Sequence, residues 1–342
     1  MMEEHELGGK LLASVSRSFY LTLKALPAGL REPLSMAYLL ARAADTLADT
    51  AGVSQSLKMD CLGEFDRLVQ SNLRDEAAER EFCARLLREF VPMQSDADEA
   101  MLLQRLPEAF DALRKYPDRQ LMNIRGVLAP IVRGQMLDVS RFPVDGELRA
   151  LRSEEELDEY TWLVAGCVGE FWTKLCAEEL QDAFSKSTTT EQQMERGIRF
   201  GKGLQLVNIL RDIGKDFAMG RCYLPQDTLS KNGIFLGGLR RDPSLLLPLL
   251  PIWQERCREH LLCGLEFVSN VEHRRLRYAV ALPLLLGVRT LALLETVTWE
   301  QRMAGVKVSR GEVAKIMVEA GIASLRANGI RKMVERFMSA SP

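Results

Sequence analysis

Residues 36–49 read Met36-Ala-Tyr38-Leu-Leu-Ala-Arg42-Ala-Ala-Asp45-Thr-Leu-Ala-Asp49, and this segment combines a helical period with four regularly spaced polar residues. Its apolar residues recur at the three- and four-residue spacing of one helix face. Tyr38, Arg42, Asp45 and Asp49 fall at i, i+4, i+7 and i+11, which places them in one polar stripe. Such a stripe on an apolar helix is unfavourable unless it lines a cavity, because burying unpaired charge is costly. The stretch therefore predicts a helix that carries a polar site.

A second stretch repeats this arrangement far downstream. Gln205, Asn208, Asp212 and Asp216 fall at i, i+3, i+7 and i+11, after the apolar run 204–210. Two facing pairs of aspartates would form an oxygen-rich site for Mg²⁺, which prefers carboxylate ligands and keeps waters and substrate phosphates. Each pair alone is more typical of a solvated helix end. The two stripes together favour a metal and diphosphate site.

Arginines lie in or beside both acidic segments: Arg17, Arg42, Arg211 and Arg221. The guanidinium fork matches the oxygens of a diphosphate, although each arginine taken alone could form a surface ion pair. Adjacent helical residues diverge by about 100°, so Arg211 is expected to point away from Asp212.

The helical period continues through most of the chain, and no sustained alternating run indicates a strand. We therefore expect an all-α fold, with one helical domain over 1–342. The expected helices cover 6–13, a second stretch ending at residue 26, 33–49, 55–72, 77–90, 96–115, 118–140, 154–184, 190–217, 242–268, 272–298 and 310–339.

Local signals predict where these helices begin, bend and pack. Pro107 and Pro130 are expected to kink or break a helix, and Asp118, Asp242 and Ser309 to cap helix N-termini. The glycines at 166, 169, 201 and 203 lie within helical patterns, where they predict close backbone packing or room for a ligand.

Composition excludes several classes of protein. The 342 residues are 47% hydrophobic and 27% charged, the balance of a soluble globular chain. Lys+Arg 45 against Asp+Glu 47 gives a net charge of −2, which argues against a nucleic-acid binder. Seven cysteines without a C-x-x-C pair favour a reducing cytoplasm over disulfides or zinc. The first ten residues do not resemble a signal peptide, and the longest apolar run, 278–288, is shorter than the ~20 residues of a membrane span.

Four segments, in this order, resemble the squalene/phytoene synthase family. They are Ser16-Arg-Ser-Phe19, the stretch 38–49, Tyr160-Thr-Trp-Leu-Val-Ala-Gly-Cys-Val-Gly169, and 205–216 leading to Arg221-Cys-Tyr-Leu-Pro225. The resemblance extends from residue 16 to about residue 317. It implies an isoprenoid-synthase helical bundle around a central apolar cavity, with the two aspartate motifs near its mouth.

The resemblance also implies a role for each matching residue. The implied Mg²⁺ ligands are Asp45, Asp49, Asn208, Asp212 and Asp216. The implied diphosphate-binding residues are Ser16, Arg17, Tyr38, Arg42, Gln205, Asn208, Arg211 and Arg221. Tyr160 matches a tyrosine that transfers a proton or stabilises a carbocation in this family. The implied catalytic residues are therefore Tyr160 and the four aspartates. A buried helix tyrosine with a satisfied hydroxyl is an equally good interpretation.

The activity implied is that of a squalene synthase, a Mg²⁺-dependent farnesyl-diphosphate farnesyltransferase. Two farnesyl diphosphates would be joined head to head into presqualene diphosphate, which NADPH would then reduce to squalene for sterol or hopanoid biosynthesis. The alternative within the family is a dehydrosqualene or phytoene synthase, which loses a proton instead. An alternative of another class is a non-catalytic helical protein that binds prenyl lipids.

The NADPH site is implied by the segment 306–312. Lys307 and Arg310 match its basic positions, whereas Ser309 stands where a further basic residue is usual and Ala48 replaces an acidic residue within the first motif. The same resemblance assigns Arg17, Arg42 and Arg211 to cofactor binding. No G-x-G-x-x-G motif follows a strand, so NADPH would bind without a Rossmann fold. The oily product suggests peripheral membrane contact of a cytoplasmic enzyme.

Overall fold

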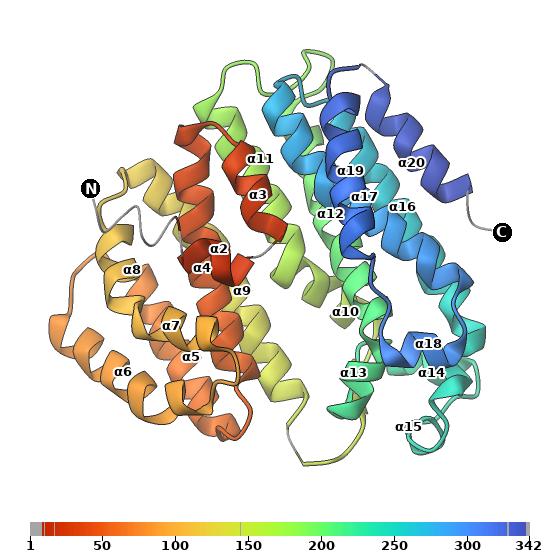
Figure 1. The fold of residues 1–342 in the computed structure, drawn as a ribbon. Coiled ribbons are helices and arrows are strands. Elements are labelled where there is room, and N and C mark those ends of the chain that lie inside the picture. The colour runs from red at the N-terminus through yellow and green to blue at the C-terminus, as the bar shows by residue number, and fades with distance from the viewer. Residues whose placement is uncertain (1–8, 10, 17, 144, 327, 340–342) are drawn as a thin grey trace. The chain divides into compact units, whose positions relative to one another are not determined.

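The computed structural model describes residues 9, 11–16, 18–143, 145–326 and 328–339, without the side chains of residues 16, 18–21 and 28. The chain divides into two compact units, Met1–Pro143 and Val144–Pro342. The all-α class predicted from the sequence is confirmed, since helices make up nearly all the regular structure of the described residues (Figure 1). A single domain over 1–342 and a central apolar cavity stay predictions.

The first unit is built around one long helix, α4. Its elements are α2 (Leu12–Ser16), α3 (Ser18–Ala25), α4 (Ala28–Asp49), α5 (Gln55–Gln70), α6 (Glu76–Glu89), the 3₁₀ turn η2 (Val91–Met93), α7 (Ala97–Gln104), α8 (Leu106–Leu113) and α9 (Asp118–Arg141). Helix α4 packs against α9, α5 and α7. Phe65, Phe82 and Phe110 pack together in the core, with ring centroids 6.0–6.4 Å apart.

Helix α4 starts earlier than predicted. It begins at Ala28 and continues through Pro33, where the sequence predicted its start. Proline removes one backbone hydrogen bond. The buried apolar face, with Leu40 and Leu47 fully inaccessible, offsets this loss because it holds the helix against its neighbours.

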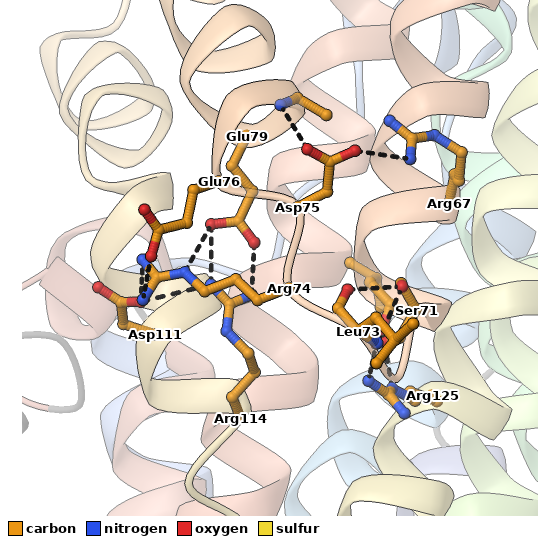
Figure 2. A network of polar contacts seen from close by, with 12 residues as sticks. Arg67, Ser71, Leu73, Arg74, Asp75, Glu76, Glu79, Asp111, Arg114 and Arg125 are labelled. Atoms are coloured by element: carbon orange, nitrogen blue, oxygen red, sulfur yellow. Dashed lines mark hydrogen bonds and ion pairs between the residues drawn. The ribbon is translucent and has the colours of Figure 1, made fainter.

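A network of ion pairs ties α6 to α8 on the outside of the first unit (Figure 2). The guanidinium of Arg114 binds both oxygens of Glu79, at 2.6 and 2.8 Å, and Glu79 is only 8% exposed. Arg74 lies beside the same carboxylate and pairs with Asp111 at 3.0 Å. These charges are satisfied by one another, so the network has the contacts of a structural clamp.

The second unit is built around α12, which packs against α16, α11 and α17. Its elements are β1 (Arg149–Ala150), α10 (Glu154–Thr161), the π-helical turn η3 (Trp162–Gly166), α11 (Cys167–Glu179), α12 (Thr190–Arg211), α13 (Ile213–Ala218), β2 (Arg221–Cys222), α14 (Gln226–Lys231), α15 (Leu236–Leu239), the 3₁₀ helix η4 (Pro243–Leu249), α16 (Leu250–Ser269), α17 (Arg274–Thr296), α18 (Trp299–Ala304), α19 (Arg310–Ala323) and α20 (Gly329–Ser339). The short strands β1 and β2 pair in parallel.

The glycines within these helices permit close packing, as predicted. A Cβ atom on Gly169 would lie 2.0 Å from the carbonyl oxygen of Gly197, and one on Gly201 would lie 2.3 Å from that of Ala165. A Cβ atom on Gly203 would lie 2.8 Å from the Cβ of His260. Helix α12 therefore approaches η3, α11 and α16 more closely than side chains would allow.

Proline and cap signals were partly correct. The predicted helix 96–115 is broken at Arg105, and Pro107 stands in the first turn of α8, which confirms the expected break. Pro130 instead lies inside α9, which continues through it. The prediction that Asp118 caps α9 is wrong, because Pro117 holds the N-cap position and Asp118 is the first helical residue.

The other two predicted caps are confirmed. The side chain of Asp242 accepts a hydrogen bond from the backbone of Ser244, although the helix that it caps is the 3₁₀ helix η4. Ser309 accepts from the backbone N–H of Glu312 at the start of α19.

Further predicted long helices are interrupted, among them 242–268, which is divided into the 3₁₀ helix η4 and α16. The range 154–184 contains α10, η3 and α11, and the range 310–339 is divided into α19 and α20. A Cβ atom on Gly329 would lie 2.2 Å from the carbonyl oxygen of Ala323, so the chain turns tightly between these two helices. The range 190–217 is broken at Asp212, within the second aspartate motif.

Helix α17 has the length and composition of a membrane span, which the sequence did not predict. The helix has 23 residues, and its most apolar 18-residue window has a mean hydropathy of 1.6. Of its most apolar window, 67% is buried inside the protein, where α17 contacts α12, α16, α19 and α20. This burial is typical of the core helix of a folded domain.

Candidate functional site

The first aspartate motif lies on the last three turns of α4. Asp45 is 33% exposed, and its Oδ2 accepts a hydrogen bond from Nη1 of Arg42, one turn earlier. Its Oδ1 accepts from Nε2 of Gln135 on α9, at 3.2 Å. Asp49 follows one turn later, is exposed and ends the helix. The structure thus brings together Arg42, Asp45 and Asp49 as the sequence predicted.

Two further residues of this site were missed by the sequence analysis. Gln135 binds Asp45, and Glu99 on α7 accepts a hydrogen bond from Nη2 of Arg42. Both come from helices remote in the sequence, and their own segments carry no polar stripe that would have singled them out.

The electrostatics of the first motif favour a cation. Burial and the neighbouring charge of Asp49 raise the pKa of Asp45 to about 6, whereas Arg42 opposes this rise. The same surroundings raise the pKa of Tyr38, mainly through burial. The hydroxyl of Tyr38 lies 3.5 Å from the carbonyl oxygen of Val15. Arg42 therefore does not fully offset the cost of charging Asp45, and a divalent cation would favour the charged form of this carboxylate.

The second motif lies where α12 ends. Asp212 is the C-cap of α12 and also the N-cap of α13, with φ −99° and ψ 11°. Arg211 binds its carboxylate through Nε at 2.9 Å and Nη2 at 2.5 Å. The prediction that Arg211 points away is wrong, because the break in the helix at Asp212 removes the regular rotation between neighbours.

The remaining polar residues of the second motif lie on the adjoining turns. Nδ2 of Asn208 donates to Oε1 of Gln205 at 3.2 Å. The N–H of Asp216 donates to the carbonyl oxygen of Asp212 at 2.9 Å, so the two aspartates still lie one turn apart. Arg221 follows in β2, after a turn at Gly220 with φ +75°.

Tyr160 lies in the last turn of α10 and is 7% exposed. Its ring stacks on that of Tyr223, with centroids 4.9 Å apart and an interplanar angle of 21°. The chain continues directly into the π-helical turn η3. Such turns are frequent at functional sites. The geometry is compatible with both interpretations of this tyrosine.

The predicted cofactor residues at the start of α19 are exposed. Lys307 lies in the segment between α18 and α19, and Arg310 is the first residue of α19. Backbone N–H groups at the start of a helix favour anions, so Lys307, Arg310 and the N-terminus of α19 would all attract a negatively charged group. Of the other predicted residues, Arg17 and the side chain of Ser16 lie outside the described residues.

The donor chemistry of both motifs fits Mg²⁺. Within the described parts of the chain, no group of three or more His, Cys, Asp or Glu side chains is arranged to hold a metal ion unaided. Each motif instead offers a pair of carboxylates one turn apart. Mg²⁺ is commonly bound through one or two carboxylates together with substrate phosphates, so a pair of this kind is sufficient.

Comparisons with known proteins identify the family of the chain. The model of the family described as squalene/phytoene synthase matches residues 12–312. The human squalene synthase is 25% identical over 315 residues, covering 91% of this chain and 68% of that protein. The phytoene synthase of Mycobacterium bovis is 25% identical over 338 residues, covering 96% of this chain and 94% of that protein.

A relative of mixed function is also similar. The bifunctional lycopene cyclase/phytoene synthase of Phaeosphaeria nodorum is 30% identical over 224 residues. The match covers 64% of this chain and 34% of that protein, so the chain spans about a third of its length.

Solved structures share the fold. The complex of TcSQS with the ligand BPH1237 has a TM-score of 0.78 at 18% identity, covering 99% of this chain and 91% of that one. A dehydrosqualene synthase has a TM-score of 0.57 at 20% identity, covering 93% of this chain and 96% of that one. With the match of the family model over most of its length, the chain belongs to the squalene/phytoene synthase family.

Proposed function

We propose that this protein is a squalene synthase, which joins two molecules of farnesyl diphosphate and reduces the product with NADPH. Members of the family are prenyltransferase-type enzymes of isoprenoid biosynthesis that use prenyl diphosphates. The observation that carries the proposal is that both aspartate motifs are complete, each with an arginine bound to its first aspartate. A non-catalytic prenyl-lipid binder would not need these costly carboxylates.

The aspartates would serve as metal ligands. Asp45 and Asp49 would hold Mg²⁺ at one motif, and Asp212 and Asp216, with Asn208, at the other. Bound Mg²⁺ stabilises the negative charge that develops on a departing diphosphate. The raised pKa of Asp45 supports this role, because a nearby cation would restore the charged form of the carboxylate.

The diphosphates would be bound by arginines and neutral polar groups. Arg42 and Arg211 already lie against the motif carboxylates, and Arg221 follows the second motif. The further diphosphate-binding groups would be Ser16, Arg17, Tyr38, Gln205 and Asn208. Breaking the allylic C–O bond leaves a carbocation, which the double bond of the second prenyl chain attacks. Loss of a proton closes a cyclopropane ring, and presqualene diphosphate ionises in turn.

Tyr160 would act on the carbocation or its proton. Its ring is buried and stacked on Tyr223, so it is held in one orientation. The π face of an aromatic ring attracts cations, and a phenol can carry a proton.

The reductive step would use the exposed cations near the start of α19. Lys307 and Arg310 would bind the phosphates of NADPH, together with Arg17, Arg42 and Arg211. Bound NADPH supplies the hydride that ends the second carbocation. The alternative is a dehydrosqualene or phytoene synthase, favoured by the phytoene synthases among the relatives. We further propose a cytoplasmic location with peripheral contact to a membrane, in keeping with an oily product.

Product analysis tests the proposal. Purified protein is incubated with farnesyl diphosphate and Mg²⁺, with and without NADPH, and the hydrocarbons are identified by mass spectrometry. Squalene that appears only with NADPH is the expected result. Dehydrosqualene despite NADPH would support the alternative. Parallel incubations with geranylgeranyl diphosphate complete the test, because a preference for that substrate would indicate a phytoene synthase.

A further inference from the structure

The guanidinium of Arg42 is shared between two carboxylates from different helices. Its Nη1 donates to Asp45 on α4, and its Nη2 donates to Glu99 on α7. Its Nε is buried and makes no hydrogen bond within the described residues. The orientation of Arg42 therefore depends on the two carboxylates at its tip.

Asp45 is in turn held from both sides. Arg42 binds one oxygen and Gln135 on α9 binds the other, at 3.2 Å. Helices α7 and α9 both pack against α4. Three helices thus fix one aspartate–arginine pair of the first motif.

Glu99 changes what Arg42 can do when a metal approaches. A cation at Asp45 must compete with the guanidinium for the same carboxylate oxygens. Of the two carboxylates that bind Arg42 in the described residues, only Asp45 would remain if Glu99 were removed, so the guanidinium would hold Asp45 more tightly. With Glu99 present, Arg42 keeps one partner while Asp45 turns its oxygens toward a metal.

We propose that Glu99 is a positioning residue, which holds Arg42 beside the first aspartate motif and releases Asp45 for a metal ion. The inference rests on the proposed metal role of that motif. It assigns to Glu99 no contact with substrate, since it acts through Arg42. Released from Asp45, Nη1 of Arg42 faces the motif and is available to a diphosphate oxygen.

A double-mutant cycle on metal affinity tests this role. Mn²⁺ serves as the probe and is titrated with inorganic diphosphate present, followed by electron paramagnetic resonance, on the full chain. D45N defines the part of the binding that depends on Asp45. Glu99→Gln keeps the shape of the side chain and removes its charge, so Arg42 is left with Asp45 as its ion-pair partner. Loss of a group that orients a metal ligand typically weakens affinity about tenfold, and we expect this for E99Q.

The second half of the cycle separates positioning from a simple charge effect. In an Arg42→Met background, E99Q is expected to change the affinity less than about twofold, because Glu99 no longer has an arginine to hold. Equal loss in both backgrounds would show that Glu99 acts as a local charge, and would overturn the proposal. Unchanged affinity in E99Q, or the absence of any Asp45-dependent binding, would overturn it as well.

Two further variants keep the result interpretable. Glu79→Gln removes the same charge from another carboxylate held by an arginine, within the network of Figure 2, and should leave Mn²⁺ affinity unchanged. Glu99→Asp retains the charge and should bind Mn²⁺ more tightly than E99Q does. This variant tests the proposal even if E99Q folds poorly. Product formation is not read in these titrations. The two proposals can therefore fail separately. If the protein binds Mn²⁺ through Asp45 with the expected cycle but forms no squalene, the proposed function is rejected and the role of Glu99 is retained.

Discussion

Replacing Asp45 by Asn separates the metal role of this residue from its role in the fold. Burial and the charge of Asp49 raise the pKa of Asp45 from 3.8 to about 6. The folded protein therefore binds a proton more tightly than the unfolded chain. The stability linked to this proton is fully present below pH 3.8 and is lost as the pH rises through 6. At neutral pH the charged carboxylate destabilises the metal-free fold.

The size of this effect follows from the same values. A rise from 3.8 to about 6 corresponds to about 3 kcal/mol at 1.36 kcal/mol for each tenfold step. The side chain is 33% exposed, so solvent screening reduces this to about 1–2 kcal/mol. Asp45→Asn should raise the unfolding free energy at pH 7 in EDTA by about that amount, and by much less at pH 4. In the presence of Mg²⁺ it should abolish turnover.

Urea denaturation at the two pH values measures the stability, and product formation measures turnover. Asp66→Asn is a matched control, because burial also raises the pKa of Asp66, whose carboxylate accepts a hydrogen bond from Gln70 outside the motif. D66N should keep full activity. Lower stability of D45N at pH 7 would exclude a destabilising charge on Asp45, and more than about a tenth of the activity would exclude an essential metal ligand at this position.

Three further predictions concern other parts of the second unit. Burial and the charge of Arg199 lower the pKa of His260 to about 4, so His260 should contribute a fall of about 2 kcal/mol in the unfolding free energy between pH 7 and pH 5. His260→Gln should remove this contribution in urea titrations, whereas the opposite contribution of Asp45 should remain. An equal pH dependence in both proteins would exclude His260 as its source. Arg302 is 4% exposed and donates to the carbonyl oxygens of Leu210 and Leu294, near the ends of α12 and α17. Arg302→Met should lower the unfolding free energy in urea by about 2–4 kcal/mol, because these buried carbonyl groups lose their donor. A cost below about 0.5 kcal/mol would contradict this. Lys307→Ala should shift the products from squalene toward presqualene diphosphate or a non-reduced hydrocarbon, and an unchanged product ratio on chromatography would remove Lys307 from the NADPH site.

The fold class could be predicted because the helical period is local information. The stripe of Arg42, Asp45 and Asp49 survives in α4, since that helix is regular from Ala28 to Asp49. Glycine signals also held, because Gly169 and Gly201 sit where backbones touch.

What the sequence did not predict depends on tertiary contacts. The break at Asp212 is stabilised where Gly214 of α13 packs against α18, since a Cβ atom there would lie 2.1 Å from the carbonyl oxygen of Met303. This contact joins segments some ninety residues apart, and no local pattern reports it. Glu99 and Gln135 were missed for the same reason. Their roles arise only when α7 and α9 pack on α4.

Head-to-head condensation of two farnesyl diphosphates is required by both the proposed function and the dehydrosqualene alternative. The most direct measurement incubates the purified chain with farnesyl diphosphate and Mg²⁺ without NADPH, and identifies the products by mass. We predict a product that contains both farnesyl chains, either presqualene diphosphate or a hydrocarbon formed from it, and its loss in D45N and in D212N. Recovery of unreacted farnesyl diphosphate, or of farnesol alone, would exclude head-to-head condensation by this protein.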